Sequence, residues 1–340
     1  MLRSSREPLH AAYDTALLDL DGVVYAGGRA VGHAVPALAA ARSAGMRLAY
    51  VTNNASRTPE AVAEHLTELG VAAEAVEVVT SAQAVARLVA EQTDPGARVL
   101  CVGGEGLRVA LVERGLRLVE SAEDEPVAVV QGYGGPELPW GRLAEAALAV
   151  GRGAAWYASN TDLTIPTGRG IAPGNGAAVE VVRIATRWMR EAPEPRVAGK
   201  PMPPMHRETI LRTGARRPLV VGDRLDTDIE GAHAGGVDSL LVLTGVCDAA
   251  QLLRARPEHR PTFVAADLRG LLTPHTRPVP EDGAWRCGGW TARATAQEVT
   301  LDGDGERLDG LRALCGAAWT AAGDGACALD VEKALARLGP

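Results

Sequence analysis

The sequence is poor in aromatic residues: only 1 of its 340 residues is phenylalanine, and aromatic residues make up 4% of the chain. It also has no long run of lysine and arginine, and its formal net charge is −7. Nucleic acids and anionic membrane surfaces attract basic patches. This balance therefore argues against both kinds of partner.

Cysteine is scarce too, and no two cysteines form a CxxC pair. The 5 cysteines are Cys101, Cys247, Cys287, Cys315 and Cys327. We therefore expect no disulfide framework and no zinc site, and we expect a reducing compartment. The basic start MLRSSREPLH is not followed by an uninterrupted apolar segment, because acidic residues break the next run. This pattern predicts neither a signal peptide nor a transmembrane helix, and so a cytoplasmic protein.

Short apolar runs alternate with alanine-rich runs of helical spacing along most of the chain. This alternation predicts an α/β protein with a Rossmann-like, doubly wound parallel sheet. A length of 340 residues exceeds the ~150 of a typical single domain. We expect residues 1–80 and 195–272 to form a core, residues 81–194 an inserted α/β cap, and residues 273–340 a small C-terminal extension.

Four polar motifs lie where predicted strands end. They are DLDGVVY with Asp19 and Asp21, VTNN with Thr52 and Asn53, AGKP with Lys200, and VVGDRLDTD with Asp223 and Asp228. In open parallel sheets the carboxyl ends of the strands meet in one crevice. Carboxylates are hard oxygen ligands that suit Mg²⁺. A divalent cation would also cancel the repulsion between neighbouring aspartates.

The same motifs supply groups for phosphoryl transfer. The hydroxyl of Thr52 and the amides near Asn53 can donate to phosphate oxygens, and Lys200 adds a positive charge. An aspartate can act as the nucleophile and form an aspartyl-phosphate. A carboxyl group two residues further on can protonate the leaving alcohol and then activate water.

The order and spacing of these motifs resemble the haloacid dehalogenase superfamily of phosphatases over residues 13–272. Within that superfamily, LDLDGVVY, TNNAS, SNTDLTIPTGRGIAPGNGA and GKPMPPM resemble the 4-nitrophenylphosphatase branch, of the subfamily IIA type. That branch includes phosphoglycolate, pyridoxal-phosphate and glycerol-3-phosphate phosphatases. Dehalogenating members lack the second aspartate of the DxDG motif, so Asp21 favours phosphate chemistry.

Carried over by position, the resemblance implies roles for the motif residues. It makes Asp19 the nucleophile and a Mg²⁺ ligand, and Asp21 the general acid and base, which ligates Mg²⁺ through its backbone carbonyl. Asp223 is implied as the third protein ligand. The remaining residues follow: Thr52 and Asn53 bind phosphate, Lys200 neutralises it, and Asp228 orients the ligands or Lys200 from the second layer.

The predicted cap contributes further candidates. Asn160, Asp162 and Pro166 lie on the loop best suited to face the core crevice, and we consider Asn160 and Asp162 as substrate-binding residues. The segment QGYGGPELPW, residues 131–140, lacks the Asp-Arg pair that relatives often carry, so its role stays open. The resemblance also implies a homodimer formed through the cap.

We predict a Mg²⁺-dependent phosphatase of a small phosphorylated metabolite, with glycerol 3-phosphate favoured on resemblance alone. Phosphoglycolate, pyridoxal phosphate and nucleotide or sugar phosphates remain alternatives. A binding or regulatory protein with weak catalysis is the alternative of another class. In the extension, Trp285 and Trp290 of WRCGGW either anchor it to the body or line a partner site, with anchoring favoured.

Overall fold

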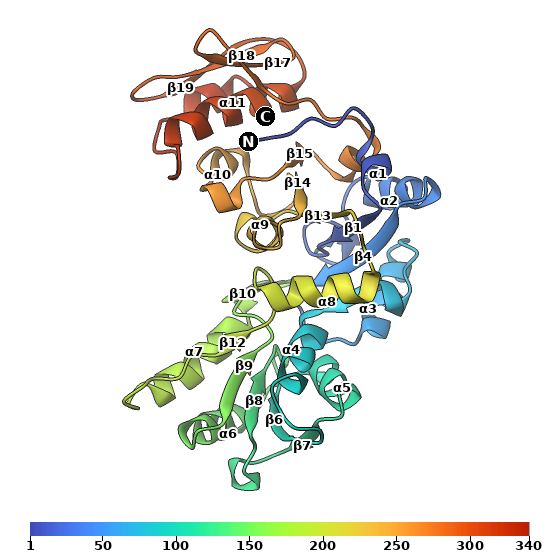
Figure 1. Ribbon diagram of the computed structural model, residues 1–340, viewed down its shortest axis with the longest axis vertical. Helices are drawn as coiled ribbons and strands as arrows, with labels where there is room; N and C mark the ends of the chain where they lie inside the picture. The colour runs from blue at the N-terminus through green and yellow to red at the C-terminus, as the bar shows by residue number, and fades with distance from the viewer. Residues whose placement is uncertain (340) are drawn as a thin grey trace. The chain divides into compact units, whose positions relative to one another are not determined.

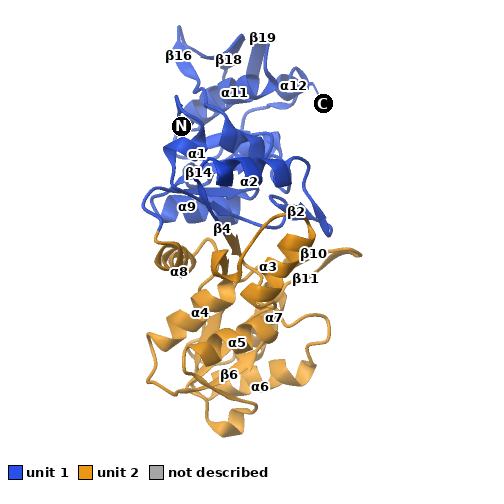
Figure 2. Ribbon diagram, turned by 90° about the vertical axis from the view of Figure 1, so that its right-hand side faces the viewer, with its two compact units in different colours: residues 1–49, 215–340 blue, residues 50–214 orange. Residues whose placement is uncertain are grey.

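The computed structural model describes residues 1–339, apart from the side chain of Pro166. The chain divides into two compact units, residues 1–49 with 215–340 (unit 1) and residues 50–214 (unit 2), as Figure 2 shows in blue and orange. Strand β4 (Arg47–Thr52) passes from unit 1 into unit 2. The division does not fall at the boundaries that we expected after residues 80 and 194, and those boundaries stay a prediction.

Unit 1 is built on parallel strands in the order β15–β14–β13–β1 (Figure 1). Their bounds are β1 (Thr15–Leu18), β13 (Pro218–Gly222), β14 (Asp238–Val242) and β15 (Phe263–Ala265). The strands are short apolar runs and mostly buried, as expected for a parallel sheet covered on both faces. Leu18 is paired with Val221, so strands β1 and β13 end side by side.

Short helices and one hairpin connect these strands. They are α1 (Leu9–Ala12), β2 (Tyr25–Ala26), β3 (Arg29–Ala30), α2 (Ala34–Ser43), the π-helix η3 (Leu225–Ile229), α9 (Glu230–Ala234), α10 (Ala249–Leu253), and the 3-10 helices η4 (Pro257–His259) and η5 (Leu268–Leu272). Helix α9 continues directly from η3, so the chain becomes helical shortly after β13 ends.

The C-terminal extension forms an antiparallel sheet against one long helix. Its elements are β16 (Val279–Glu281), β17 (Ala284–Cys287), β18 (Trp290–Ala294), β19 (Val299–Gly303), α11 (Arg307–Ala322) and α12 (Glu332–Ala336). Residues 310–319 of α11 are all buried, so the helix is enclosed on every side. Its side chains share one apolar cluster with Leu241 and Val264 of the parallel sheet. Trp290, 5% exposed, lies in this cluster, which supports the anchoring interpretation.

Unit 2 contains a second parallel sheet, with the strand order β12–β9–β8–β6–β7. The elements of this unit, with the end of β4, are α3 (Pro59–Glu68), η1 (Ala75–Glu77), β5 (Val78–Thr80), α4 (Ser81–Ala90), β6 (Arg98–Val102), α5 (Glu105–Glu113), β7 (Arg117–Val119), η2 (Ala122–Asp124), β8 (Ala128–Gln131), α6 (Trp140–Gly151), β9 (Ala155–Ala158), β10 (Thr164–Thr167), β11 (Gly170–Pro173), α7 (Asn175–Thr186), β12 (Arg196–Val197) and α8 (Pro203–Thr213).

Strand β12 of this unit lies in a different sheet from the one that the sequence predicted. We expected VAGKP to resume the core sheet, but its first residue lies in β12, which pairs with β9 of the sheet in unit 2. The parallel sheets flanked by helices confirm the α/β class. None of the helices in residues 1–339 is long and apolar enough to cross a membrane.

Candidate active site

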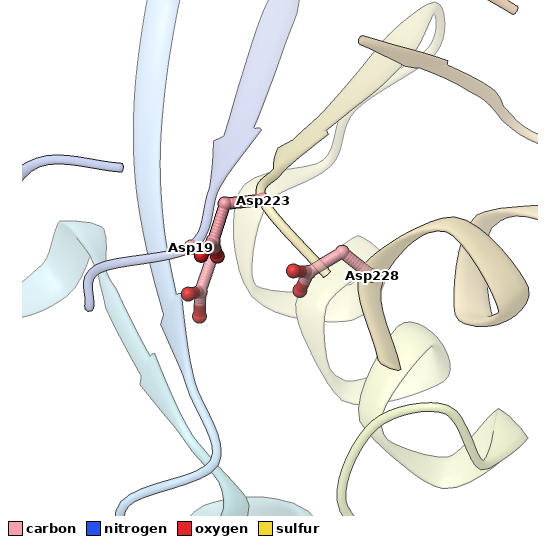
Figure 3. A group of neighbouring side chains, drawn as sticks. All are labelled: Asp19, Asp223 and Asp228. Carbon is pink, nitrogen blue, oxygen red and sulfur yellow. The ribbon is translucent and has the colours of Figure 1, made fainter. Parts of the chain in front are cut away.

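Three carboxylates meet at the carboxyl ends of strands β1 and β13. Asp19 follows β1, Asp223 follows β13, and Asp228 lies in η3. Oxygens of all three lie within 4.8 Å of one another, and Figure 3 shows Asp228 approaching the other two from its helix. The backbone N–H of Asp19 donates to Val221 O at 2.8 Å, which fixes the end of one strand against the next.

Glycines leave the room that these carboxylates occupy. A Cβ added at Gly245 would lie 1.9 Å from Asp223 Oδ2, and one at Gly22 would lie 2.3 Å from the same atom. Gly22 also has φ +86°, a conformation that side chains other than that of glycine rarely adopt. A Cβ at Gly222 would clash with Asp228 at 2.2 Å. The backbone therefore packs directly on the acids and holds them in place.

A loop after β14 completes the acidic cluster, and we did not foresee it. The N–H of Val246 donates to Asp223 Oδ2 at 2.7 Å, and the N–H of Cys247 donates to the backbone oxygen of Asp223 at 3.0 Å. The hydroxyl of Thr244 donates to Gly22 O at 2.6 Å. The only sequence signal is LTGV, a glycine after a buried strand, which is too common to identify a site.

The other acids of the two motifs take different places. Asp21 is exposed and its backbone bridges to Tyr25, and its carboxylate is not part of the group formed by Asp19, Asp223 and Asp228. Asp226 forms a two-pronged ion pair with Arg224, at 3.0 and 2.8 Å. Burial alone would raise the pKa of Asp226, but the hydrogen bonds and charge of Arg224 outweigh it and lower that pKa. Asp226 is therefore a structural ion-pair partner of Arg224.

The cluster suits a hard divalent cation. Its donors are carboxylate oxygens alone, without histidine or cysteine, and such a set prefers Mg²⁺ or Ca²⁺. Like charges this close repel, and a cation among them removes that cost. Asp228, which the sequence assigned to a supporting layer around the ligands, lies in this group, and its Oδ2 accepts from Arg224 N at 3.2 Å.

In unit 2, Asn53 links the other predicted residues. Its Oδ1 accepts from the N–H of Lys200 at 2.8 Å, and its Nδ2 donates to Lys200 O at 3.1 Å and to Asp162 Oδ2 at 3.1 Å. Asn160 Nδ2 donates to Asn53 O at 2.7 Å. The Lys200 ammonium donates to Val51 O at 3.1 Å. The side chain of Asn53 thus fixes the backbone of Lys200 on both sides.

Two further predicted residues adjoin this network. Thr52 ends β4, is 3% exposed, and accepts from the N–H of Asn54 at 3.0 Å through its hydroxyl oxygen. Asn160, 4% exposed, also accepts from the N–H of Asp162 at 3.2 Å. The side chain of Pro166 lies outside the part of the chain that the structure describes. We expected Asn53 to touch phosphate, and its role in holding Lys200 was not foreseen.

Comparison with known proteins gives these residues a family. The model of haloacid dehalogenase-like hydrolases matches residues 16–117, and a second model of HAD-hydrolase-like proteins matches residues 197–271. A model described as a GCN5-related N-acetyltransferase like domain matches residues 287–339, in the C-terminal extension. The sequence had suggested no family for that extension.

Individual relatives match much more of the chain. D-glycerol 3-phosphate phosphatase of Mycobacterium tuberculosis is 46% identical over 315 residues, which cover 91% of this chain and 86% of that protein. Acid sugar phosphatase of Staphylococcus saprophyticus is 35% identical over 76% of this chain and 97% of that protein. A crystal structure of glycerol phosphate phosphatase from Mycobacterium tuberculosis in complex with magnesium matches with a TM-score of 0.86 and 43% identity, covering 98% of this chain and 99% of that one.

Acidic residues at the ends of parallel strands, as found here, fit these family models. The chain belongs to the haloacid dehalogenase-like hydrolases, which confirms the resemblance seen in its motifs. Within that family it is a phosphatase.

Proposed function

We propose that this phosphatase hydrolyses glycerol 3-phosphate to glycerol and inorganic phosphate and that it requires Mg²⁺. The relative named for that substrate matches 91% of the chain, including much of the C-terminal extension, whereas the acid sugar phosphatase matches 76%. The observation that carries the chemistry is the group of Asp19, Asp223 and Asp228 at the strand ends.

In this proposal the side chains of Asp19 and Asp223 and the backbone carbonyl of Asp21 would hold Mg²⁺. When bound, the ion would supply positive charge that neutralises the phosphoryl group. Asp228, tied to the N–H of Arg224, adds negative charge beside the ligands and orients them.

The two chemical steps use two carboxyl groups. An oxygen of Asp19 attacks phosphorus, the bond to the glycerol oxygen breaks, and Asp21 gives its proton to the departing alkoxide. Asp21 then takes a proton from water, which attacks the aspartyl-phosphate and releases phosphate and Asp19. The exposure of Asp21, outside the carboxylate group, suits a residue that exchanges protons with substrate and water.

The proposal assigns phosphate binding to residues of unit 2. Lys200 neutralises the phosphoryl oxygens, and Thr52 and Asn53 donate to them. Asn160 and Asp162 contact the organic part of the substrate. Support comes from the hydrogen bonds through which Asn53 fixes Lys200 and meets Asp162.

A substrate panel tests this function. We expect kcat/KM for glycerol 3-phosphate to exceed that for phosphoglycolate, pyridoxal phosphate and a hexose phosphate by at least ~10-fold, because one lost polar contact costs about that much. A better substrate among the other three would replace the assignment. No Mg²⁺-dependent hydrolysis of any of them would favour a binding or regulatory protein.

Mg²⁺ binding is tested without turnover. At ~100 times its Kd, Mg²⁺ is expected to stabilise the fold by ~2.7 kcal/mol, and to raise the melting temperature accordingly. Asp223→Asn should lose this shift, whereas Asp226→Asn, in which the exposed ion pair with Arg224 is lost, should retain it. An equal shift in both variants would show that the ion binds elsewhere.

We also propose that the chain forms a homodimer through unit 2 and is cytoplasmic. Helices α6 and α7, which pack against each other, present large apolar side chains to the surface: Trp140 (71% exposed), Leu148 (50%), Ile184 (58%), and just after α7, Trp188 (74%). Such patches mark protein contacts. Trp188→Glu should convert the dimer to a monomer in light scattering, and a monomeric parent protein would reject the proposal.

The proposal of a cytoplasmic protein is supported by the cysteines. All five cysteines are free, which suits a reducing compartment.

A further inference from the structure

A cavity of unit 1 opens at the edge of the sheet opposite to the carboxylates. Its volume is about 610 Å³. It is lined by residues that lie just before or at the start of strands β1, β13 and β14, namely Tyr13, Arg216, Arg217 and Asp238. Asp19, in contrast, lies just after β1, and a strand of four residues is ~13 Å long. The cavity is therefore separate from the carboxylate cluster.

The charges that line this cavity are mostly positive. Arg3, Arg216 and Arg217 stand against Asp238, the one acidic residue in its wall. Asp238 already accepts hydrogen bonds from Arg3 Nη1 at 2.8 Å and from the Tyr13 hydroxyl at 2.7 Å. Burial raises the pKa of Tyr13, and its bond to Asp238 raises it further, so the phenol keeps its proton. Arg216 and Arg217 are thus the positive charges that Asp238 does not offset.

The backbone that carries these two arginines is fixed. Asp14 Oδ2 accepts from the N–H groups of both Arg216 and Arg217, each at 3.0 Å, and Asp14 N donates to Arg217 O at 3.1 Å. The negative charge of Asp14 also faces Arg47 Nη2, at 3.7 Å from Oδ1. Asp14 therefore holds the backbone of Arg216 and Arg217, and both arginines are exposed residues that line the cavity.

The opposite wall is the N-terminal segment, which is also held in place. Arg3 N donates to Thr262 O at 2.9 Å, and Ser5 pairs with His275 through two backbone bonds at 2.9 and 3.0 Å. Leu2, 5% exposed, lies in the apolar cluster beneath. The wall thus brings the side chains of Arg3 and Ser4 to the cavity as parts of a fixed chain.

We propose that this cavity binds a small anion that carries a phosphate group. The planar forks of two guanidinium groups match pairs of phosphate oxygens, and their charges suit a dianion. The volume is in the range of small-molecule sites. The phosphate group comes either from inorganic phosphate or from a phosphate monoester. Binding here is independent of the substrate that the carboxylate cluster hydrolyses.

Calorimetric titration at low ionic strength tests the site. The protein is the full chain with Asp19→Asn and Lys200→Ala, free of Mg²⁺, so that the catalytic residues contribute little binding. We expect one site per chain for inorganic phosphate or glycerol 3-phosphate, and the ligand that binds more tightly identifies the source. Adding Arg216→Ala and Arg217→Ala should weaken this binding at least ~10-fold, because charge-assisted hydrogen bonds are lost.

The matched control replaces two exposed arginines that do not line the cavity. Arg256→Ala and Arg277→Ala change the net charge equally and should leave the affinity unaltered. Arg216→Lys with Arg217→Lys retains the charge but not the fork, and should give an intermediate affinity. Absence of a site, or equal weakening by the control pair, would overturn the proposal.

Discussion

A compact group of charged side chains in unit 1 and another in unit 2 are built in opposite ways. Unit 1 gathers three carboxylates within 4.8 Å of one another. Unit 2 surrounds the single carboxylate of Glu208, whose side chain is 0% exposed, with three arginines, Arg87, Arg114 and Arg212. The second group is compensated within the fold, whereas the first brings like charges together. A fold keeps repelling charges close where a bound cation and a reaction use them.

The largest effect should come from removing a carboxylate of the first group. Asp19→Asn is expected to lower kcat by ~10⁴-fold or more, because the nucleophile is lost. Stability should stay the same or rise, because repulsion between like charges is relieved. Steady-state kinetics and a thermal melt measure both. Asp226→Asn, with its exposed pairing to Arg224, is the control and should retain activity within ~2-fold.

The next effect tests whether the acids are held by backbone packing. Gly245→Ala puts a Cβ 1.9 Å from Asp223 Oδ2, so the carboxylate must move. A displacement of about 1 Å is expected to lower kcat/KM by ~10²-fold. Gly141→Ala in α6, where no neighbouring atom lies within 4 Å of the added Cβ, should leave kinetics unchanged. Equal activity of the two variants would mean that Asp223 needs no such precise placement.

A smaller effect is expected in unit 2, where hydrogen bonds instead of repulsion define the site. Asn53→Ala removes the side chain that bonds both backbone groups of Lys200. We expect kcat/KM to fall by ~10-fold or more, since Lys200 loses its fixed position. Asn54→Ala removes only the turn contacts to Ser56, at 2.9 and 2.7 Å, and should cost less. Similar losses in both would point to loop folding as the cause.

The smallest effect on activity is expected for Glu208, although its loss affects stability. Burial alone would raise the pKa of Glu208, but hydrogen bonds from Arg87 and Arg212 outweigh it and lower that pKa. A depressed pKa contributes stability above the ordinary value of ~4.3, and this contribution is lost as pH falls through the folded value.

Glu208→Gln should therefore cost about 2 kcal/mol near neutral pH and leave kcat within ~2-fold. Its stability should also fall less steeply than that of the parent protein as the pH is lowered below 5. Denaturant melts at several pH values measure this. Glu123→Gln, which breaks the exposed pair with Arg152, should leave the melting midpoint unchanged.

The strand-end motifs could be predicted from the sequence because each is local. An apolar run followed at once by DLDG or GDRLD predicts both the strand and the acidic residue at its end. Parallel pairing of β1 and β13 then brings Asp19 beside Asp223. The position of Asp228 could not be derived in the same way, because it depends on the π-helix that starts only two residues after Asp223. No spacing rule predicts that turn.

Long-range contacts were harder to predict. Thr244 and Val246 reach the site because β14 lies beside β13, and their own segment carries no special pattern. Strand β12 is two residues long, and its pairing with β9 depends on the neighbouring sheet instead of on its sequence. The extension was left without a fold because its strands are short and its helix is buried on all sides, which removes the polar face that marks a surface helix.

The enclosure of helix α11 has a consequence for how the protein is made. Strand β1 is translated before unit 2, but its partner β13 and the helix that covers the apolar cluster are translated after it. Residues 50–214 form a continuous segment and can complete their own contacts during synthesis. The apolar cluster of unit 1 is completed only when residues 310–319 have been translated, so a nascent chain leaves that apolar surface uncovered until then.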